Sequence, residues 1–530
     1  MAILSLAAGM VSCNDVQSQD CVLSWSEEMS SKINGEYISS FTGSNGMLYL
    51  ANQPSNSTDK NPKATIHQLV GLSPGFTSEI ELDLGKNKKN LEASGLFGNR
   101  LFILCTDQFT REPNKNVYLK QYDPNSGEPL TMYDEIASVD HFPLVKKPLY
   151  EDFYGYMPHI NYSVTRNGDY LFVWFLEDGK GKLSGASVHV ICFNKNFKEM
   201  WRHKISARIH PDLTWPKKVL ALDKDNVAIL VQNNASIYGY SNEDCPKILG
   251  RDHLVAHYSR TKDSTFIFPI RSTKHLIYDI EIQQTSSSEY AVAGTFEMSD
   301  SKELCGLHIS YYRADEPAEQ RTLTIDADNA HWSREQVHPH SKFSNGEKRE
   351  RANDFYHLTH MSGIGDDLIL AFEHIVHFGH EEQGNLNERN GLHTGNTELL
   401  RMSRTGSVKW HQILKKNQSL SSVYIKYGSC AVISKGDRLL LLFNAAQGDG
   451  TDKEIEFKNT DMRTCIRSIQ VNSTDGTIIS NTPLANSERP FLLIPRSVDR
   501  LDENTISFVA MQNFKLTHAD VYKAATLMCP

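Results

Sequence analysis

The chain has 530 residues, with 55 Lys or Arg against 64 Asp or Glu, so its formal net charge at pH 7 is −9. This acidic balance argues against a nucleic-acid binder, which normally carries a basic domain. Hydrophobic residues make up 39% and charged residues 22%. These fractions exclude wholesale disorder, and no apolar run reaches the length of a membrane span.

Residues 1–12 predict an export signal. Met1 to Val11 is a short apolar run, and the chain turns polar from Asn14 onward. Met10-Val11-Ser12-Cys13 resembles a bacterial lipobox, in which the cysteine is lipidated, although Met10 stands where Leu is usual. We therefore expect a lipid anchor on Cys13 and a tether or N-terminal segment over residues 13–35. The alternative is an N-terminal strand buried in the fold.

An internal repeat runs through the rest of the chain. A turn rich in Gly, Asp or Asn, followed by four or five mostly apolar residues, occurs eight times at intervals of about 65 residues. The apolar segments begin at Leu48, Leu101, Leu171, Val227, Ala291, Leu368, Leu439 and Ile506. Such short apolar runs between turn residues indicate buried strands.

A strand–turn–strand pattern follows in several units. In four of them the apolar residues before and after the turn are eight positions apart: Tyr122 and Leu130, Phe193 and Trp201, Met402 and Trp410, Val471 and Ile479. Each unit thus supplies about four strands, which predicts an all-β fold. We expect one large β-propeller domain over residues 36–530, with seven or eight four-stranded blades. The rival architecture, a pair of β-sandwiches, fits eight evenly spread units less well.

The two ends of the repeat predict how the ring closes. The last unit is cut short after Ile506, so N-terminal residues are expected to complete the ring. Cys21 and Cys529 lie near the two ends, where one disulfide would close that ring. The segment from Thr517, with Asp520 three positions later, resembles a capping box and predicts a helix.

Histidines are concentrated in one region, since nine of the 21 lie between residues 331 and 393. Neutral imidazole is the commonest metal ligand, and zinc takes three or four such ligands. His374, His377, His380 and Glu381 are therefore the candidate ligands for a zinc ion. If 368–378 is one strand, His374 and His377 point to opposite faces. The alternative is a set of polar histidines without a common partner.

Two long loops are expected, over 331–354 and 378–396, and long insertions in a compact repeat are often binding loops. His357, His360, His393 and Trp332 are the candidate binding residues of this region. The alternative is a solvated excursion without a ligand. Three acidic runs, at 223–225, 326–329 and 449–452, are candidate calcium sites or ordinary turns.

Together these patterns resemble the secreted or lipid-anchored propeller proteins of Bacteroidota-type bacteria, many without an assigned function. The resemblance is one of architecture and transfers no functional residue. The eight-fold repeat, the signal-like start and the lack of a strong catalytic motif favour an exported binding or scaffolding module with a protein or glycan partner, in the periplasm or at the outer membrane or cell surface. Nucleic acid is not expected as a partner, and membrane contact is expected only through the lipid anchor.

The alternatives are a propeller hydrolase acting on a glycan or peptide, metal-assisted or not, and a structural subunit of an envelope complex. No strong catalytic motif is present, so an enzyme is not the leading expectation.

Overall fold

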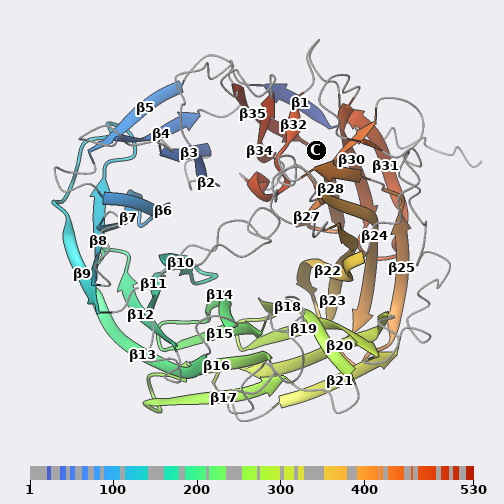
Figure 1. The fold of residues 1–530 in the computed structure, drawn as a ribbon, viewed down its shortest axis with the longest axis horizontal. Helices are drawn as coiled ribbons and strands as arrows, with labels where there is room; N and C mark the ends of the chain where they lie inside the picture. Colours follow the sequence, from blue (N-terminus) through green and yellow to red (C-terminus); the bar gives the residue numbers. More distant parts are fainter. Residues whose placement is uncertain are drawn as a thin grey trace, which may run out of the picture.

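The computed structural model shows a β-propeller in which the sheets follow one another around a ring (Figure 1). It describes residues 21–25, 36–42, 48–53, 63–69, 77–83, 89–107, 114–140, 160–177, 186–209, 214–233, 253–270, 275–298, 304–315, 320–326, 351–378, 391–416, 418–421, 428–446, 455–456, 464–484, 491–500, 505–512 and 521–529. Within these residues the strands form eight sheets, six of which have four strands.

Each four-stranded sheet is an antiparallel meander whose first strand lies nearest the ring axis and whose last strand lies at the rim (Figure 1). The first three are β2 (Glu36–Thr42), β3 (Leu48–Gln53), β4 (Lys63–Leu69) and β5 (Thr77–Asp83); β6 (Lys89–Phe97), β7 (Arg100–Asp107), β8 (Lys115–Tyr122) and β9 (Asp134–Val139); and β10 (Ile160–Val164), β11 (Tyr170–Glu177), β12 (Ala186–Asn194) and β13 (Glu199–Ile209).

The other three four-stranded sheets continue around the ring. They are β14 (Thr214–Ala221), β15 (Asn226–Asn233), β16 (His253–Ser259) and β17 (Ser264–Ile270); β18 (His275–Gln284), β19 (Glu289–Met298), β20 (Leu304–Arg313) and β21 (Gln320–Asp326); and β27 (Ala431–Lys435), β28 (Arg438–Ala446), β30 (Thr464–Asn472) and β31 (Ile478–Leu484).

The two remaining sheets are larger. One contains six strands, β22 (Arg351–Ile364), β23 (Asp367–Phe378), β24 (Gly391–Ser403), β25 (Val408–Leu414), β26 (Gln418–Ser421) and β29 (Ile455–Glu456). The other contains β1 (Val22–Trp25), β32 (Leu492–Leu493), β33 (Asp499–Arg500), β34 (Thr505–Gln512) and β35 (Val521–Met528), with the 3-10 helix η3 (Pro495–Ser497) between β32 and β33.

The repeat in the sequence corresponds to the sheets one for one. Each of the eight apolar segments is the second strand of a sheet, namely β3, β7, β11, β15, β19, β23, β28 and β34. The strand–turn–strand pattern is the hairpin of the third and fourth strands, as in the pairing of Cys192 with Trp201 and of Val471 with Ile478. The predicted propeller is therefore confirmed. The described strands form eight sheets, within the expected seven or eight.

The ring closes through both ends of the chain. β1 pairs with β35, so the N-terminus supplies the outer strand of a sheet built otherwise from the C-terminus. Cys21 and Cys529 form a disulfide beside this pair. Residues 22–25 of the predicted N-terminal segment are thus part of the propeller, where they complete the ring as expected. The physical reason is that β1 satisfies the outer backbone groups of β35 and gives this sheet the four successive strands that the other sheets have.

The helix expected from Thr517 is wrong where the structure describes it, because Val521–Met528 is strand β35, paired on both sides. Residues 517–520 lie outside the described residues. β-branched Val521 and Thr526 suit a strand, and ladder hydrogen bonds to two neighbours outweigh the local capping signal.

Apolar clusters between neighbouring sheets hold the ring together. Phe172 and Trp201 pack against Ile229 and Tyr258 of the following sheet, and the rings of Phe172 and Trp201 lie 5.5 Å apart. Trp174, Trp201 and Trp410 are all buried. Burying such large aromatic surfaces is the main source of stability at these interfaces.

One glycine is required by this packing. Gly476 follows Asp475 in the predicted turn between β30 and β31, and its φ is +78°, which favours glycine. A Cβ at this position would lie 2.8 Å from the ring of Trp410. The Trp410 indole also donates a hydrogen bond of 3.0 Å to the backbone oxygen of Ser473. The turn of one sheet therefore covers the tryptophan of its neighbour.

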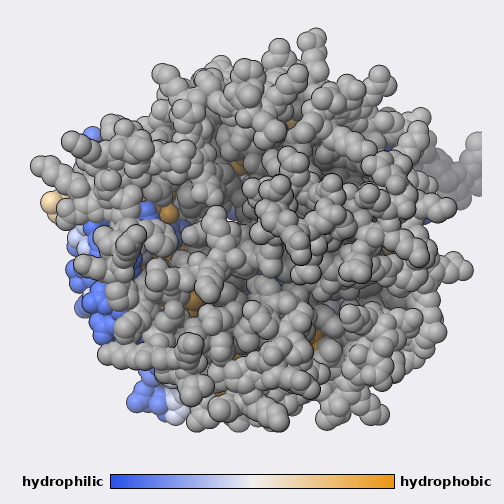
Figure 2. Space-filling model, in the orientation of Figure 1, coloured by the Kyte–Doolittle hydropathy of each residue, from blue (hydrophilic) through white to orange (hydrophobic). Residues whose placement is uncertain are grey.

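The described apolar residues form no broad patch on the face in Figure 2, where hydrophobic atoms show only at separate places. Large exposed hydrophobic residues of the described chain are distributed over several sheets: Val22, Leu130, Met132, Met200, Ile267, Ile478, Ile479 and Met528. Among the residues described, no helix has the length and apolar character needed to cross a membrane.

Candidate functional site

The inner strands of four consecutive sheets bring polar side chains together near the ring axis. β14, β18, β22 and β27 follow one another around the ring (Figure 1). We call their polar residues the axial cluster: Lys217, Lys218, Glu281, Gln283, His360, Ser362 and Ser434. Inner strands border the ring axis, and polar side chains that are partly buried there need hydrogen-bond or charged partners.

The charged half of the cluster joins β14 to β18. Lys218 Nζ lies 2.9 Å from Glu281 Oε1 and donates a 3.3 Å hydrogen bond to Gln283 Oε1. Lys217 Nζ donates to the Ile280 carbonyl at 2.6 Å and lies 3.9 Å from Glu281 Oε2. Burial by itself would raise the pKa of the Glu281 carboxyl, but Lys218 and Lys217 hold it below its usual value.

A β-bulge explains how two adjacent lysines reach the same carboxylate. Alternation along a regular strand would point Lys217 and Lys218 to opposite faces. The pairing of β14 with β15 shifts between Pro216 and Lys218, so Lys217 is an extra residue in the ladder. A bulge redirects side chains in this way. The inner strands β18 and β22 carry similar shifts, the latter between Leu358 and His360.

The second half of the cluster joins β22 to β27. Ser434 Oγ shares a 3.1 Å hydrogen bond with His360 Nε2 and a 2.7 Å hydrogen bond with Ser362 Oγ. Burial, assisted by the charge of Lys218, lowers the pKa of His360 to about 4, although Glu281 acts in the opposite direction. The imidazole is therefore neutral at pH 7, and it contacts a hydroxyl group. This arrangement can bind a polar ligand, and it is also the contact that a serine nucleophile and its base make.

The histidine-rich region is only partly described. His374 and His377 lie in β23, and His393 lies in β24 opposite Val376, but their side chains are outside what the structure describes. His380, Glu381, Trp332 and Cys13 lie outside the described residues altogether. Among the side chains that are described, no group of three or more His, Cys, Asp or Glu could hold a metal ion. The zinc site stays a prediction.

The two expected loops are shorter than the sequence predicted. β22 begins at Arg351, β23 extends to Phe378 and β24 begins at Gly391. His357, His360 and His393 are therefore strand residues. The Asn- and Gly-rich ends of these strands have low strand propensity, but pairing with β23 supplies their ladder hydrogen bonds and overrides it.

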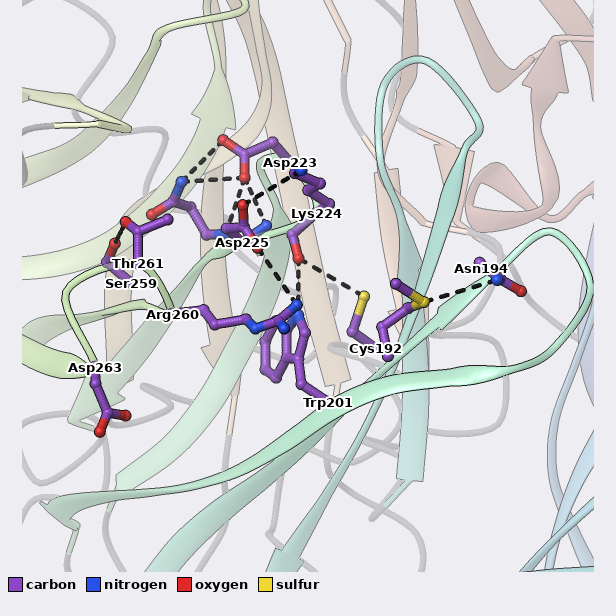
Figure 3. A network of polar contacts seen from close by, with 12 residues as sticks. Cys192, Asn194, Trp201, Asp223, Lys224, Asp225, Ser259, Arg260, Thr261 and Asp263 are labelled. Carbon is purple, nitrogen blue, oxygen red and sulfur yellow. Dashed lines mark hydrogen bonds and ion pairs between the residues drawn. The ribbon is translucent and has the colours of Figure 1, made fainter.

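The acidic run at 223–225 is a turn whose carboxylates already have partners (Figure 3). Asp223 Oδ1 accepts hydrogen bonds from the backbone N–H groups of Asp225 and Asn226, at 2.7 and 3.0 Å. Arg260 lies 3.6 Å from Asp225. The backbone oxygen of Lys224, between them, accepts from the Trp201 indole at 2.7 Å. This run therefore serves as an interface turn. Residues 327–329 and 449–452 lie outside the described part.

Sequence reasoning found His360 but missed its partners. Lys218, Glu281, His360 and Ser434 all stand five to ten positions before the first apolar residue of their unit. Charged residues there, as in Ile280-Glu281-Ile282, interrupt an apolar strand at the position nearest the axis. Comparing the residues five to ten positions before each apolar segment across the units would have found the cluster.

Comparison with protein-family models and with curated proteins gives no match. Several solved structures are similar at low identity. The β-propeller domain of the trilobed protease from Pyrococcus furiosus is 9% identical, with a TM-score of 0.35, over 83% of this chain and 97% of that one. An acylaminoacyl peptidase from Pyrococcus horikoshii is 9% identical, with a TM-score of 0.38, over 93% of this chain and 60% of that one.

A third similar structure is an ulvan lyase, described as a new polysaccharide lyase family. It is 9% identical, with a TM-score of 0.38, over 81% of this chain and 90% of that one. These similarities are too low to transfer a function.

Proposed function

We propose that this chain is a binding module that holds a glycan at the axial cluster. The observation that carries the proposal is the convergence of Lys218, Glu281, His360 and Ser434 from four inner strands. A sugar presents neighbouring hydroxyls that both donate and accept hydrogen bonds. The cluster offers an ammonium donor, a carboxylate acceptor, and hydroxyl and imidazole groups that can do either.

Partial exposure supports this assignment. The side chains of Lys218 and Glu281 are 39% and 19% exposed, so both groups reach solvent while their positions are held by each other. Binding sites are usually preformed concave regions with a few converging polar groups. The exposed hydrophobic residues of the described chain are spread over several sheets, which favours a polar ligand over an apolar protein surface.

Calorimetric titration with oligosaccharides tests the proposal. The probes are uronic-acid oligomers, such as alginate and oligogalacturonate, with dextran oligomers as the neutral comparison. Removing one charged hydrogen-bonding group costs about 1.5–3 kcal/mol, so Lys218→Met and Glu281→Gln are expected to weaken binding roughly 10- to 100-fold. The control is Lys204→Met on outer strand β13, which removes a 2.7 Å pair with Glu177 away from the axis. Equal affinity in Lys218→Met and Lys204→Met would contradict the proposal.

The Ser434–His360 hydrogen bond supports a second candidate, a propeller hydrolase in which Ser434 attacks an acyl group and His360 accepts its proton. A fluorophosphonate probe tests this directly. The hydrolase predicts labelling of Ser434, which is lost in His360→Asn. If the probe does not label Ser434 in the folded wild type, the hydrolase is ruled out and glycan binding without catalysis is the remaining function.

We further propose that the module is exported and anchored at the cell envelope through Cys13. The support is the lipobox-like sequence before Cys13. In detergent phase separation, the wild type is expected in the detergent phase and Cys13→Ala in the aqueous phase. A structural subunit would instead copurify with envelope partners while binding none of the oligosaccharides.

A further inference from the structure

A second polar cluster is buried between the six-stranded sheet and the sheet that begins with β27. Lys416, in the segment between β25 and β26, contacts Glu373 of β23 through its Nζ and the Oε1 atom. The two side chains are 2% and 0% exposed. No step of the proposed glycan binding uses either residue.

Several hydrogen bonds hold the amine in place. Lys416 Nζ donates to Thr394 Oγ1 at 2.9 Å and to Gln418 Oε1 at 3.4 Å. Thr394 in turn donates to Gln418 Oε1 at 2.7 Å, and Gln418 Nε2 donates to the Asn444 carbonyl at 2.7 Å. Because each of these neighbours is itself anchored, the Lys416 amine is held in place beside the Glu373 carboxyl.

The second oxygen of the carboxyl has its own donor. Ser429 Oγ donates a hydrogen bond to Glu373 Oε2, whereas Lys416 contacts the other carboxyl oxygen, Oε1. The Ser429 backbone has a φ of +77°, an uncommon conformation for a residue with a side chain. A 3.1 Å hydrogen bond from its N–H to Gln418 Oε1 holds it there. Strained residues of this kind occur where a side chain must be aimed at one point.

Burial makes the charged forms of this pair costly. It lowers the pKa of Lys416 to about 7, so a substantial share of the amine is unprotonated at neutral pH. An unprotonated amine is a nucleophile, whereas an ammonium group is not. The cluster therefore brings a nucleophilic nitrogen into contact with a buried carboxyl group.

We propose that Lys416 and Glu373 are joined by an isopeptide bond that forms after folding. Nζ of the neutral amine attacks Cδ of the protonated Glu373 carboxyl, the Nζ–Cδ bond forms and the Cδ–Oε2 bond breaks. Oε2 leaves as water with two protons, the one that the carboxyl carries and one that the Ser429 hydroxyl donates. Ser429 then takes up the proton that Nζ releases. The reaction is a condensation, so nothing is oxidised or reduced.

The bond would tie a strand to the segment that leads out of its own sheet. Residues 373 and 416 are 43 positions apart, and the closed loop includes β24 and β25. This bond would fix the segment between β25 and β26 to β23, at the end of the sheet where the chain passes to β27. It would be independent of the disulfide that closes the ring.

Peptide mapping of the folded full-length chain tests the proposal. A tryptic digest under reducing conditions is expected to give a branched peptide that contains Glu373 and Lys416. Its mass would be lower than the sum of the two linear peptides by one water molecule, with no cleavage after Lys416. Recovery of the two linear peptides, cleaved after Lys416, from the folded wild type would overturn the proposal and leave a hydrogen-bonded pair.

Two variants separate the chemistry from folding. Lys416→Arg keeps the charge but has no nucleophilic amine, so only linear peptides are expected. Lys415→Arg changes the adjacent lysine and is expected to keep the branched peptide. Ser429→Ala is expected to slow bond formation after refolding. A branched peptide at unchanged rate in Ser429→Ala would overturn the assigned role of Ser429. If Lys416→Arg does not fold, the wild-type map alone decides.

Discussion

The ring-closing disulfide allows a quantitative test of how this propeller is held together. Cys21 and Cys529 are separated by 508 positions, so their bond closes almost the whole chain into a loop. The chain-entropy relation gives roughly 6 kcal/mol for a loop of that size, above the range of about 0–5 kcal/mol measured for disulfides. We expect roughly 3–5 kcal/mol for the loss of the bond in Cys21→Ser/Cys529→Ser. The reason for the lower value is that residual structure in the unfolded chain reduces the entropy gained.

Scanning calorimetry converts this value into a temperature shift. An unfolding entropy of about 2.1 cal/mol/K per residue means that roughly 4 kcal/mol corresponds to a Tm about 4 °C lower. Reductant should lower the Tm of the wild type by a similar amount and leave the double variant unchanged. Cys465→Ala, at a buried free cysteine, is the control and should keep the response to reductant. A double variant with the wild-type Tm, together with a wild type indifferent to reductant, would refute the reasoning.

Two further predictions concern the sheet interfaces and pH. Gly476→Ala should destabilise the fold by about 1–3 kcal/mol more than Gly436→Ala, which is the usual cost of overpacking. Both glycines have a positive φ, but only at Gly476 would the Cβ lie against the Trp410 ring. Equal denaturant midpoints for the two variants would contradict this. Burial lowers the pKa values of His257 and His308 to about 4, so these side chains bind protons more weakly when folded. The free energy of unfolding should therefore fall as the pH drops from about 6.5 to about 4, by up to about 3 kcal/mol per histidine. His257→Asn should reduce this slope in urea titrations at stepped pH, and an unchanged slope would rule out His257 as a contributor.

Much of the architecture could be predicted because it depends on local patterns. The repeated turn and apolar segment identified the second strand of every sheet, from Leu48 to Ile506, since a buried strand needs an apolar run wherever it occurs. The spacing of Phe193 and Trp201 identified a hairpin of the outer strands, because hairpin length restricts the register. The even distribution of units favoured a ring over two sandwiches, and the structure confirms it.

The site depended on information that local patterns do not contain. Lys218, Glu281, His360 and Ser434 belong to four sheets and meet only because their strands are innermost, and the bulge at Lys217 turns two neighbouring lysines toward one carboxylate. The C-terminal segment had a helix-like start but became β35, since pairing with β1 and β34 satisfies backbone groups on both sides.

The sequence by itself determined the repeat, the strands and the fold class, because these follow from which residues can be buried. Only the tertiary structure decided which side chains of distant repeats share the axis and which are buried together, because ring closure sets those distances.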